Sequence, residues 1–170
     1  MRALFELFLD ICLLRKGPQD MPASPMLLQL TLLSYGISGI LIPLLDVSLT
    51  LSLLLTGLDL ALLTSLAYGL LALRDYRPRF VQTLTALLGT GTLLQLLALP
   101  LLFLLKQETV DASAPAWLVL LWLGLFIWGI VIMAHILRHA LSTSLGVGVL
   151  YSLAYVLLYW NLSGWLQPVS

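Results

Sequence analysis

One carboxylate lies in the middle of a long apolar run. Asp59, in the sequence TGLDLALL, is the only charged residue between Val47 and Leu73. An ionised aspartate at mid-bilayer costs about 2.5–3.5 kcal/mol on insertion scales, so such a residue is a candidate for proton or ion handling. The other interpretation is a structural or helix-docking contact, in which Tyr155 or Gln95 at similar depth donates a hydrogen bond to Asp59. We expect the structural or helix-docking role, with ion handling as the alternative.

A second candidate for chemistry is the histidine pair in HILRH. His135 and His139 are four residues apart, so on a helix both project to one side, a spacing typical of a two-ligand metal pair. Further ligands would have to come from Cys12 and Asp10 near the amino terminus. Histidines beside Arg138 at a membrane boundary are more often interfacial groups or partners of lipid phosphate. We therefore predict no metal and no cofactor, with a cofactor-holding enzyme subunit as the weaker alternative.

No motif of an enzyme accompanies these residues. The sequence has no GxSxG, no phosphate-binding loop and no glycine fingerprint after a strand. An intramembrane aspartic protease would need a second carboxylate at the depth of Asp59, whereas Asp46 is expected at the membrane surface. The prediction is a non-enzymatic protein.

Composition indicates where these residues lie. Hydrophobic residues make up 61% of the chain and charged residues 9%, against about 25% charged residues in soluble domains. No fold of this size could hide so much apolar surface from water, so the lipid bilayer must surround most of it. The net charge is zero, and no nucleic-acid partner is expected.

Five apolar runs are long enough to cross a bilayer, which takes roughly 20 helical residues. They cover residues 26–45, 47–73, 80–105, 117–137 and 145–166. The predicted fold class is an all-α integral membrane protein, a five-transmembrane-helix bundle with an amino-terminal interfacial amphipathic helix. We divide it into residues 1–25, the interfacial helix and a proline-rich turn, and the transmembrane domain 26–170. Short links predict antiparallel neighbours.

The amino-terminal segment is apolar but too short to span. Arg2, Glu6 and Asp10 recur every four residues and form one polar stripe, so residues 1–14 should lie in the interface or dock on the bundle. Glu6 and Asp10 interrupt the apolar stretch and no small-residue cleavage site follows. A cleaved signal peptide is therefore not expected.

Basic residues predict the orientation. With five spans, seven of them fall on one side and only Lys106 falls on the other. The seven are Arg2, Arg15, Lys16, Arg74, Arg77, Arg79 and Arg138. The positive-inside rule then places the amino terminus in the cytoplasm and the carboxyl terminus outside. In the sequence RDYRPR, Arg74, Arg77 and Arg79 are candidates for binding anionic lipid head groups.

The second span carries small residues at every fourth position. Gly57, Ala61, Ser65 and Gly69 form one stripe, which lets helices approach closely in lipid. We expect this stripe to pack inside the bundle, with a dimer seam as the alternative. Because Asp59 lies on a different side, the helix should be central in the bundle or touch a second protein.

Two stretches resemble known sequences. ICLLRKGPQDMPASP and RFVQTLTALLGTG resemble small inner-membrane proteins of Gram-negative bacteria, and the layout is similar to the Ypt-interacting-protein (Yip) family. The resemblance implies a cytoplasmic amino-terminal segment, five spans with very short links, and roles in membrane organisation or protein recruitment.

We therefore predict a scaffold or accessory subunit of the bacterial inner membrane. It would bind other membrane proteins or form a homo-oligomer. The alternative is a small transporter or channel subunit that uses Asp59 as a buried titratable group, with Tyr155 and Gln95 along its path.

Overall fold

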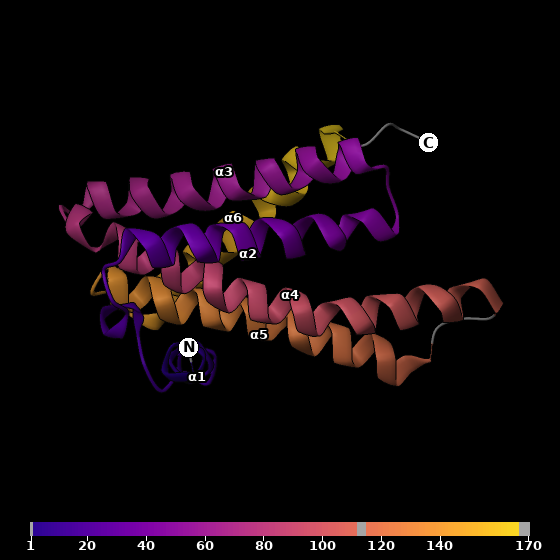
Figure 1. Cartoon of the computed structure of the whole chain (residues 1–170), viewed down its shortest axis with the longest axis horizontal. Helices are drawn as coiled ribbons and strands as arrows, with labels where there is room; N and C mark the ends of the chain where they lie inside the picture. The colour runs from indigo at the N-terminus through magenta and orange to yellow at the C-terminus, as the bar shows by residue number, and fades with distance from the viewer. Residues whose placement is uncertain (1, 112–114, 167–170) are drawn as a thin grey trace.

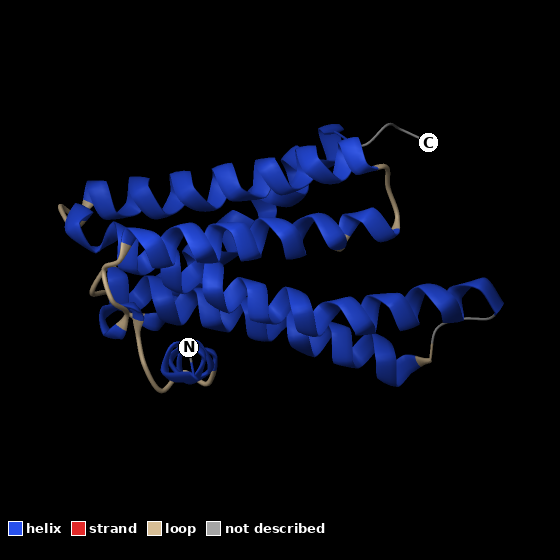
Figure 2. Cartoon of the chain, in the orientation of Figure 1, coloured by secondary structure: helices blue, strands red, loops and turns tan. Residues whose placement is uncertain are grey.

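The computed structural model describes residues 2–111 and 115–166, which form helices and short connections and no strand (Figure 2). The α-helices are α1 (Arg2–Cys12), α2 (Pro25–Leu41), α3 (Leu49–Leu73), α4 (Phe80–Asp111), α5 (Ala116–Ala140) and α6 (Leu145–Leu166). Three 3₁₀ turns join them, η1 (Pro18–Asp20), η2 (Pro43–Leu45) and η3 (Arg77–Arg79). Five of these helices are long and apolar enough to cross a membrane. The predicted all-α bundle is confirmed.

Capping residues and prolines explain where the helices begin and end. The Ser24 hydroxyl accepts a hydrogen bond from the Leu27 amide at 3.3 Å, and Pro25 follows at the first helical position of α2. Helix α2 ends at Leu41, two residues before Pro43, which has no amide hydrogen to donate to the helix and begins the 3₁₀ turn η2. A capping residue and two prolines thus account for the ends of α2.

The predicted loop between the third and fourth spans is wrong in part. We expected a loop from Lys106 to Ala116, but α4 continues to Asp111. Lysine, glutamine and glutamate favour helix, and the sequence has no glycine or proline between Pro100 and Pro115. The charged residues therefore mark where the helix leaves the apolar region and not where it ends. Residues 112–114 lie outside the described part of the chain.

Helix α4 is central in the bundle. It packs most extensively on α2, also on α5, and less on α3, while α6 packs on α5 and α3. Figure 1 shows α2 and α3 on one side, α4 and α5 on the other, and α6 crossing behind them. Consecutive helices α3 and α4 therefore touch less than the non-consecutive pair α2 and α4.

Helix α1 lies across the others and is seen end-on in Figure 1. It docks on α4 and α5 through Ile11, which is fully buried, and through Phe8, whose ring occupies the space where a side chain at Gly89 would lie. Burial raises the pKa of the Cys12 thiol to about 11. Of the two predicted arrangements for this segment, the described side chains show docking on the bundle.

The small-residue stripe of α3 faces away from the bundle. Gly57, Ala61 and Ser65 are exposed, and a β-carbon at Gly57 or Gly69 would meet nothing within 4 Å. The expectation that this stripe packs inside, on a central helix, is wrong. Helix α3 lies at the margin and turns the side with Ser52, Thr56 and Asp59 inward, so the opposite side points outward.

A close contact between helix backbones lies elsewhere, between α5 and α6. A β-carbon at Gly148 would collide with the backbone carbonyl oxygen of Ala134, whereas Gly146 on the same helix faces open space. Backbone atoms cannot rotate away as a side-chain end can. Gly148 is therefore required for this contact.

We predict that Gly148→Ala separates α5 from α6 and lowers the free energy of unfolding by about 1–3 kcal/mol, the usual cost of overpacking. Gly146→Ala is the matched control and should be neutral or stabilising by up to about 1 kcal/mol, because alanine favours helix. Unfolding in mixed micelles, followed by circular dichroism, measures both. Equal effects of the two substitutions would contradict the close contact.

Candidate functional site

The carboxylate of Asp59 joins three helices. Tyr35 on α2 donates a hydrogen bond from its hydroxyl to Asp59 Oδ2 at 2.6 Å, and Tyr155 on α6 donates one to Asp59 Oδ1. Asp59 itself is on α3 and is partly buried. Of the predicted donors, Tyr155 therefore does bond Asp59, and Tyr35 completes the pair. We refer to these three residues as the Asp59 cluster.

A glycine on α4 positions Tyr35. A β-carbon at Gly91 would lie 2.5 Å from Tyr35 Cε2, so only glycine lets the ring lie against the α4 backbone. Tyr35 is 7% exposed, and its hydroxyl reaches past α4 to α3. Gly91, which has no side chain, thus leaves room for Tyr35 to donate to Asp59.

Gln95 was also a predicted partner of Asp59, but the structure gives it a different one. Ser38 on α2 donates a hydrogen bond to Gln95 Oε1. Gln95 lies within 3.5 Å of the position a β-carbon at Gly39 would take, so it packs on α2. Its amide therefore links α4 to α2, while Asp59 links α3 to α2 and α6.

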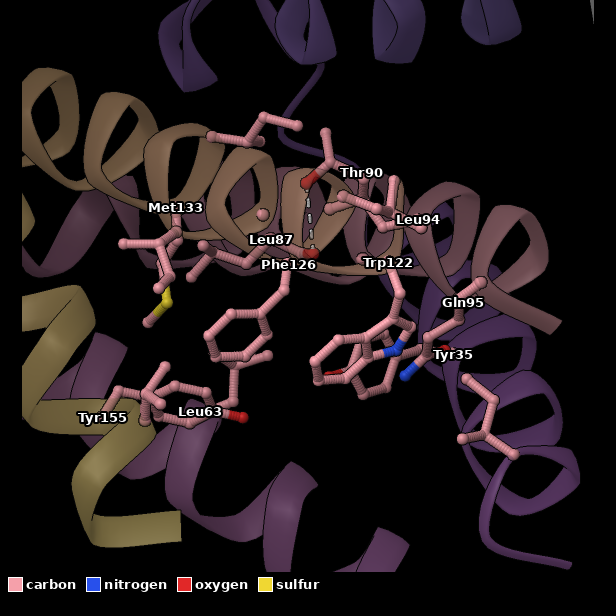
Figure 3. Close-up of a pocket in the computed structure, with 18 residues that line it drawn as sticks. Tyr35, Leu63, Leu87, Thr90, Leu94, Gln95, Trp122, Phe126, Met133 and Tyr155 are labelled. Carbon is pink, nitrogen blue, oxygen red and sulfur yellow. Dashed lines mark hydrogen bonds between the residues drawn. The ribbon is translucent and has the colours of Figure 1, made fainter. Parts of the chain in front are cut away.

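A largely apolar pocket adjoins the Asp59 cluster. Its volume is about 260 Å³, and Tyr35, Tyr155 and Gln95 are among the residues that line it. Figure 3 shows the rings of Trp122 and Phe126 in this space. The two rings stack with centroids 5.7 Å apart and planes 8° from parallel.

This pocket was not found from the sequence. Trp122 and Phe126 belong to a predicted apolar span, and in a sequence the apolar wall of a pocket has the same composition as a side that faces lipid. Phe126 is 40% exposed, so the pocket opens at the bundle surface. Its size is close to the lower end of small-molecule sites, which hold roughly 300–1,000 Å³. The pocket can receive a small apolar group beside the Asp59 cluster.

The histidine pair does project to one side, as predicted, with ring centroids 4.6 Å apart. However, His135 Nε2 lies 3.0 Å from the carbonyl oxygen of Lys16, and His139 Nε2 lies 3.2 Å from an Arg138 nitrogen. In the described residues no three histidine, cysteine or acidic side chains gather as a metal site would require. The weak metal candidates therefore contact the amino-terminal segment and an arginine.

The three arginines that were predicted to bind lipid head groups make different contacts in the structure. All three are exposed at the connection between α3 and α4, but they differ in their contacts. Arg79 instead reaches across the bundle, where its Nη1 donates hydrogen bonds to the Ala140 carbonyl and the Ser142 hydroxyl, both at 3.1 Å. Of the three arginines, Arg79 is thus the one that hydrogen-bonds to the end of α5 and the turn after it.

Comparison of the chain with protein-family models, curated proteins and solved structures finds no match. The similarity to the Yip family therefore stays a prediction. Function has to be argued from the Asp59 cluster, the pocket and the outer surface of the bundle.

We predict that Tyr155→Phe lowers the free energy of unfolding by about 1–3 kcal/mol, because it leaves one oxygen of Asp59 without its donor. In an Asp59→Leu background the same substitution should cost less than about 0.5 kcal/mol. Denaturant titration in micelles measures all four chains.

Tyr68→Phe serves as the control for this cycle, since Tyr68 is also on α3 but is half exposed. It should be neutral in both backgrounds. Equal costs of Tyr155→Phe with and without Asp59 would show that the bond does not stabilise the fold.

Proposed function

We propose that this chain is a non-enzymatic scaffold or accessory subunit of the bacterial inner membrane, which binds another membrane protein or a second copy of itself. The five apolar helices support a multi-pass membrane protein. The distribution of basic residues favours an amino terminus in the cytoplasm and a carboxyl terminus outside.

The outward small-residue stripe of α3 is the observation that supports this proposal. Helices in lipid gain little from the hydrophobic effect when they associate, and depend on close packing and hydrogen bonds. Gly57, Ala61 and Ser65 give α3 a smooth outer side on which a neighbouring helix backbone can lie. The stripe is not used inside the described bundle, so its close-packing capacity is available to a partner.

The Asp59 cluster supports the same proposal indirectly. Both oxygens of the carboxylate accept hydrogen bonds from tyrosines within the chain. A carboxylate satisfied in this way holds α3 in a fixed rotation, with the stripe outward. The acid then serves the binding surface by orienting the helix that carries it.

Cysteine cross-linking in native membranes tests the proposed surface. In a Cys12→Ser background, Ala61→Cys that carries a thiol-attached photo-cross-linker should become linked to its neighbour on illumination, and Gly124→Cys labelled in the same way should not. Both positions are exposed on apolar helices, so the experiment compares the outer surface of α3 with that of α5. A product of twice the 18.7 kDa chain mass indicates a second copy, and another mass indicates a different subunit.

A bulky residue provides the matched control. Gly57→Leu should abolish the Ala61→Cys product, whereas Gly124→Leu should leave it unchanged, because both glycines are exposed and a β-carbon at either one meets nothing within 4 Å. Equal cross-linking from Ala61→Cys and Gly124→Cys would contradict a partner on α3.

The second candidate function is a small transporter or channel subunit with Asp59 as its titrating group. One observation favours it: Tyr35 and Tyr155, which hold Asp59, also line the pocket of about 260 Å³. A small solute in that pocket would lie beside the hydroxyls that determine the charge environment of the acid. The mostly apolar lining favours a weakly polar solute over a hydrated ion.

Proteoliposomes that contain only this chain test the transport alternative. Proton flux, read by an enclosed pH-sensitive dye, should exceed that of protein-free liposomes and fall to their level with Asp59→Asn, which keeps the side-chain size but cannot titrate. Tyr68→Phe should leave the flux unchanged. Wild-type flux equal to that of protein-free liposomes would exclude proton conduction through Asp59 by the chain alone.

A further inference from the structure

A second, polar pocket lies at the end of the bundle that carries Arg74, Arg77, Arg79 and Arg138, which we call the basic end. The pocket has a volume of about 230 Å³. Four parts of the chain line it: the turn η1, the junction of η3 with α4, the end of α5, and the turn between α5 and α6. The lining residues are Pro18, Gln19, Arg79, Gln82, Thr83, His139, Ala140 and Ser142.

The charge of this lining is one-sided. It includes the guanidinium of Arg79 and no carboxylate. The nearby acid Asp20 accepts a hydrogen bond from the Gly17 amide at 2.8 Å, which holds it within its own turn. Among the described residues, ion pairs join Asp10 to Lys16 and Asp46 to Lys106, and Arg79 is in neither of them. The positive charge of Arg79 thus faces a polar cavity whose lining holds no carboxylate.

Arg79 is held in place with donors to spare. Its Nη1 bonds to Ala140 and Ser142, and the ring of Tyr76 lies 4.4 Å from the guanidinium carbon. Arginine carries five N–H donors in a rigid fork, and these contacts use only Nη1. The Nε and Nη2 groups therefore remain able to bind two oxygens of one anion.

Neighbouring side chains add further donors. Ser142 accepts from Arg79 and so keeps its own hydroxyl hydrogen, and Gln82 uses one amide hydrogen on the Met21 carbonyl at 2.7 Å. Arg138 donates to His139 Nε2, which places the hydrogen of a neutral His139 ring on Nδ1. An anion with several acceptor oxygens is the chemistry that such a set of donors matches.

We infer that this pocket binds a phosphate group, with Arg79 as its charged anchor. Arg79 immediately precedes Phe80, the first residue of α4, so the pocket lies where the apolar span begins. A phospholipid head group can reach it from the bilayer edge, and a free phosphate can reach it from the aqueous side. This inference does not rest on the proposed partner binding by α3, which uses a different surface.

The structure also selects among the basic residues of RDYRPR. Arg74 and Arg77 lie on the same connection and, like Arg79, are exposed, but neither of them lines the pocket. Their charges act on the membrane surface in general, while Arg79 acts at a built site. This difference provides two matched controls for one substitution.

Lipid binding to the purified full chain in detergent, measured by native mass spectrometry, tests the inference. The probes are phosphatidylglycerol and a diacylglycerol with the same acyl chains but no phosphate. The wild-type chain should retain phosphatidylglycerol preferentially. Arg79→Gln should weaken that binding at least about tenfold, since loss of one charged hydrogen-bonding group is worth that much, and Arg74→Gln and Arg77→Gln should change it less than about twofold.

Inorganic phosphate distinguishes the two sources. If millimolar phosphate competes with phosphatidylglycerol on the wild-type chain, the pocket accepts free phosphate as well. If phosphate does not compete while Arg79→Gln still loses the lipid, the ligand is a head group. Either result supports the phosphate site.

Two further variants keep the test decisive if Arg79→Gln does not fold. Arg79→Lys retains the charge without the fork and should bind with intermediate affinity, and Ser142→Ala, at an exposed turn position, should weaken binding about two- to fivefold. Equal retention of phosphatidylglycerol and diacylglycerol by the wild-type chain would overturn the inference. So would equal losses from Arg79→Gln and Arg77→Gln.

Discussion

The hydrogen bonds from Tyr35 and Tyr155 to Asp59 fix the rotation of α3, the transmembrane helix that lies at the margin of the bundle. In lipid an unsatisfied carboxylate costs several kcal/mol, so the acid turns toward its two donors and the helix turns with it. The opposite side of α3 is then exposed. A buried polar contact in this way determines which apolar surface meets the bilayer.

Glycines divide into two groups by what surrounds them. At Gly89, Gly91 and Gly148 a side chain would collide with a ring or a backbone, and these positions allow α1, α2 and α5 to approach their neighbours. At Gly57 and Gly124 a β-carbon would meet nothing within 4 Å. The first group holds the bundle together, while the second leaves surfaces whose use depends on other molecules. Gly57 differs from Gly124 because it belongs to a stripe of small residues.

The two ends of the bundle are built differently. At one end Lys106 pairs with Asp46 at 2.9 Å, which joins α4 to the connection between α2 and α3. At the basic end the amino-terminal segment covers α4 and α5, and Arg79 and His139 surround a polar pocket. Opposite charges thus pair at the first end, whereas the pocket lining at the basic end carries the charge of Arg79 and no carboxylate.

Composition and periodicity were enough to predict the fold class, five spans and the amino-terminal helix, and they named Tyr155 as one of two possible donors to Asp59. Length in lipid and the satisfaction of polar groups dictate these features from local residues alone. Only the tertiary structure decided that the stripe at Gly57 faces outward, that Gln95 bonds Ser38, and that Arg79 lines a pocket. The periodicity of a helix gives the angles between its own side chains, but contacts with neighbouring helices set its rotation about its axis.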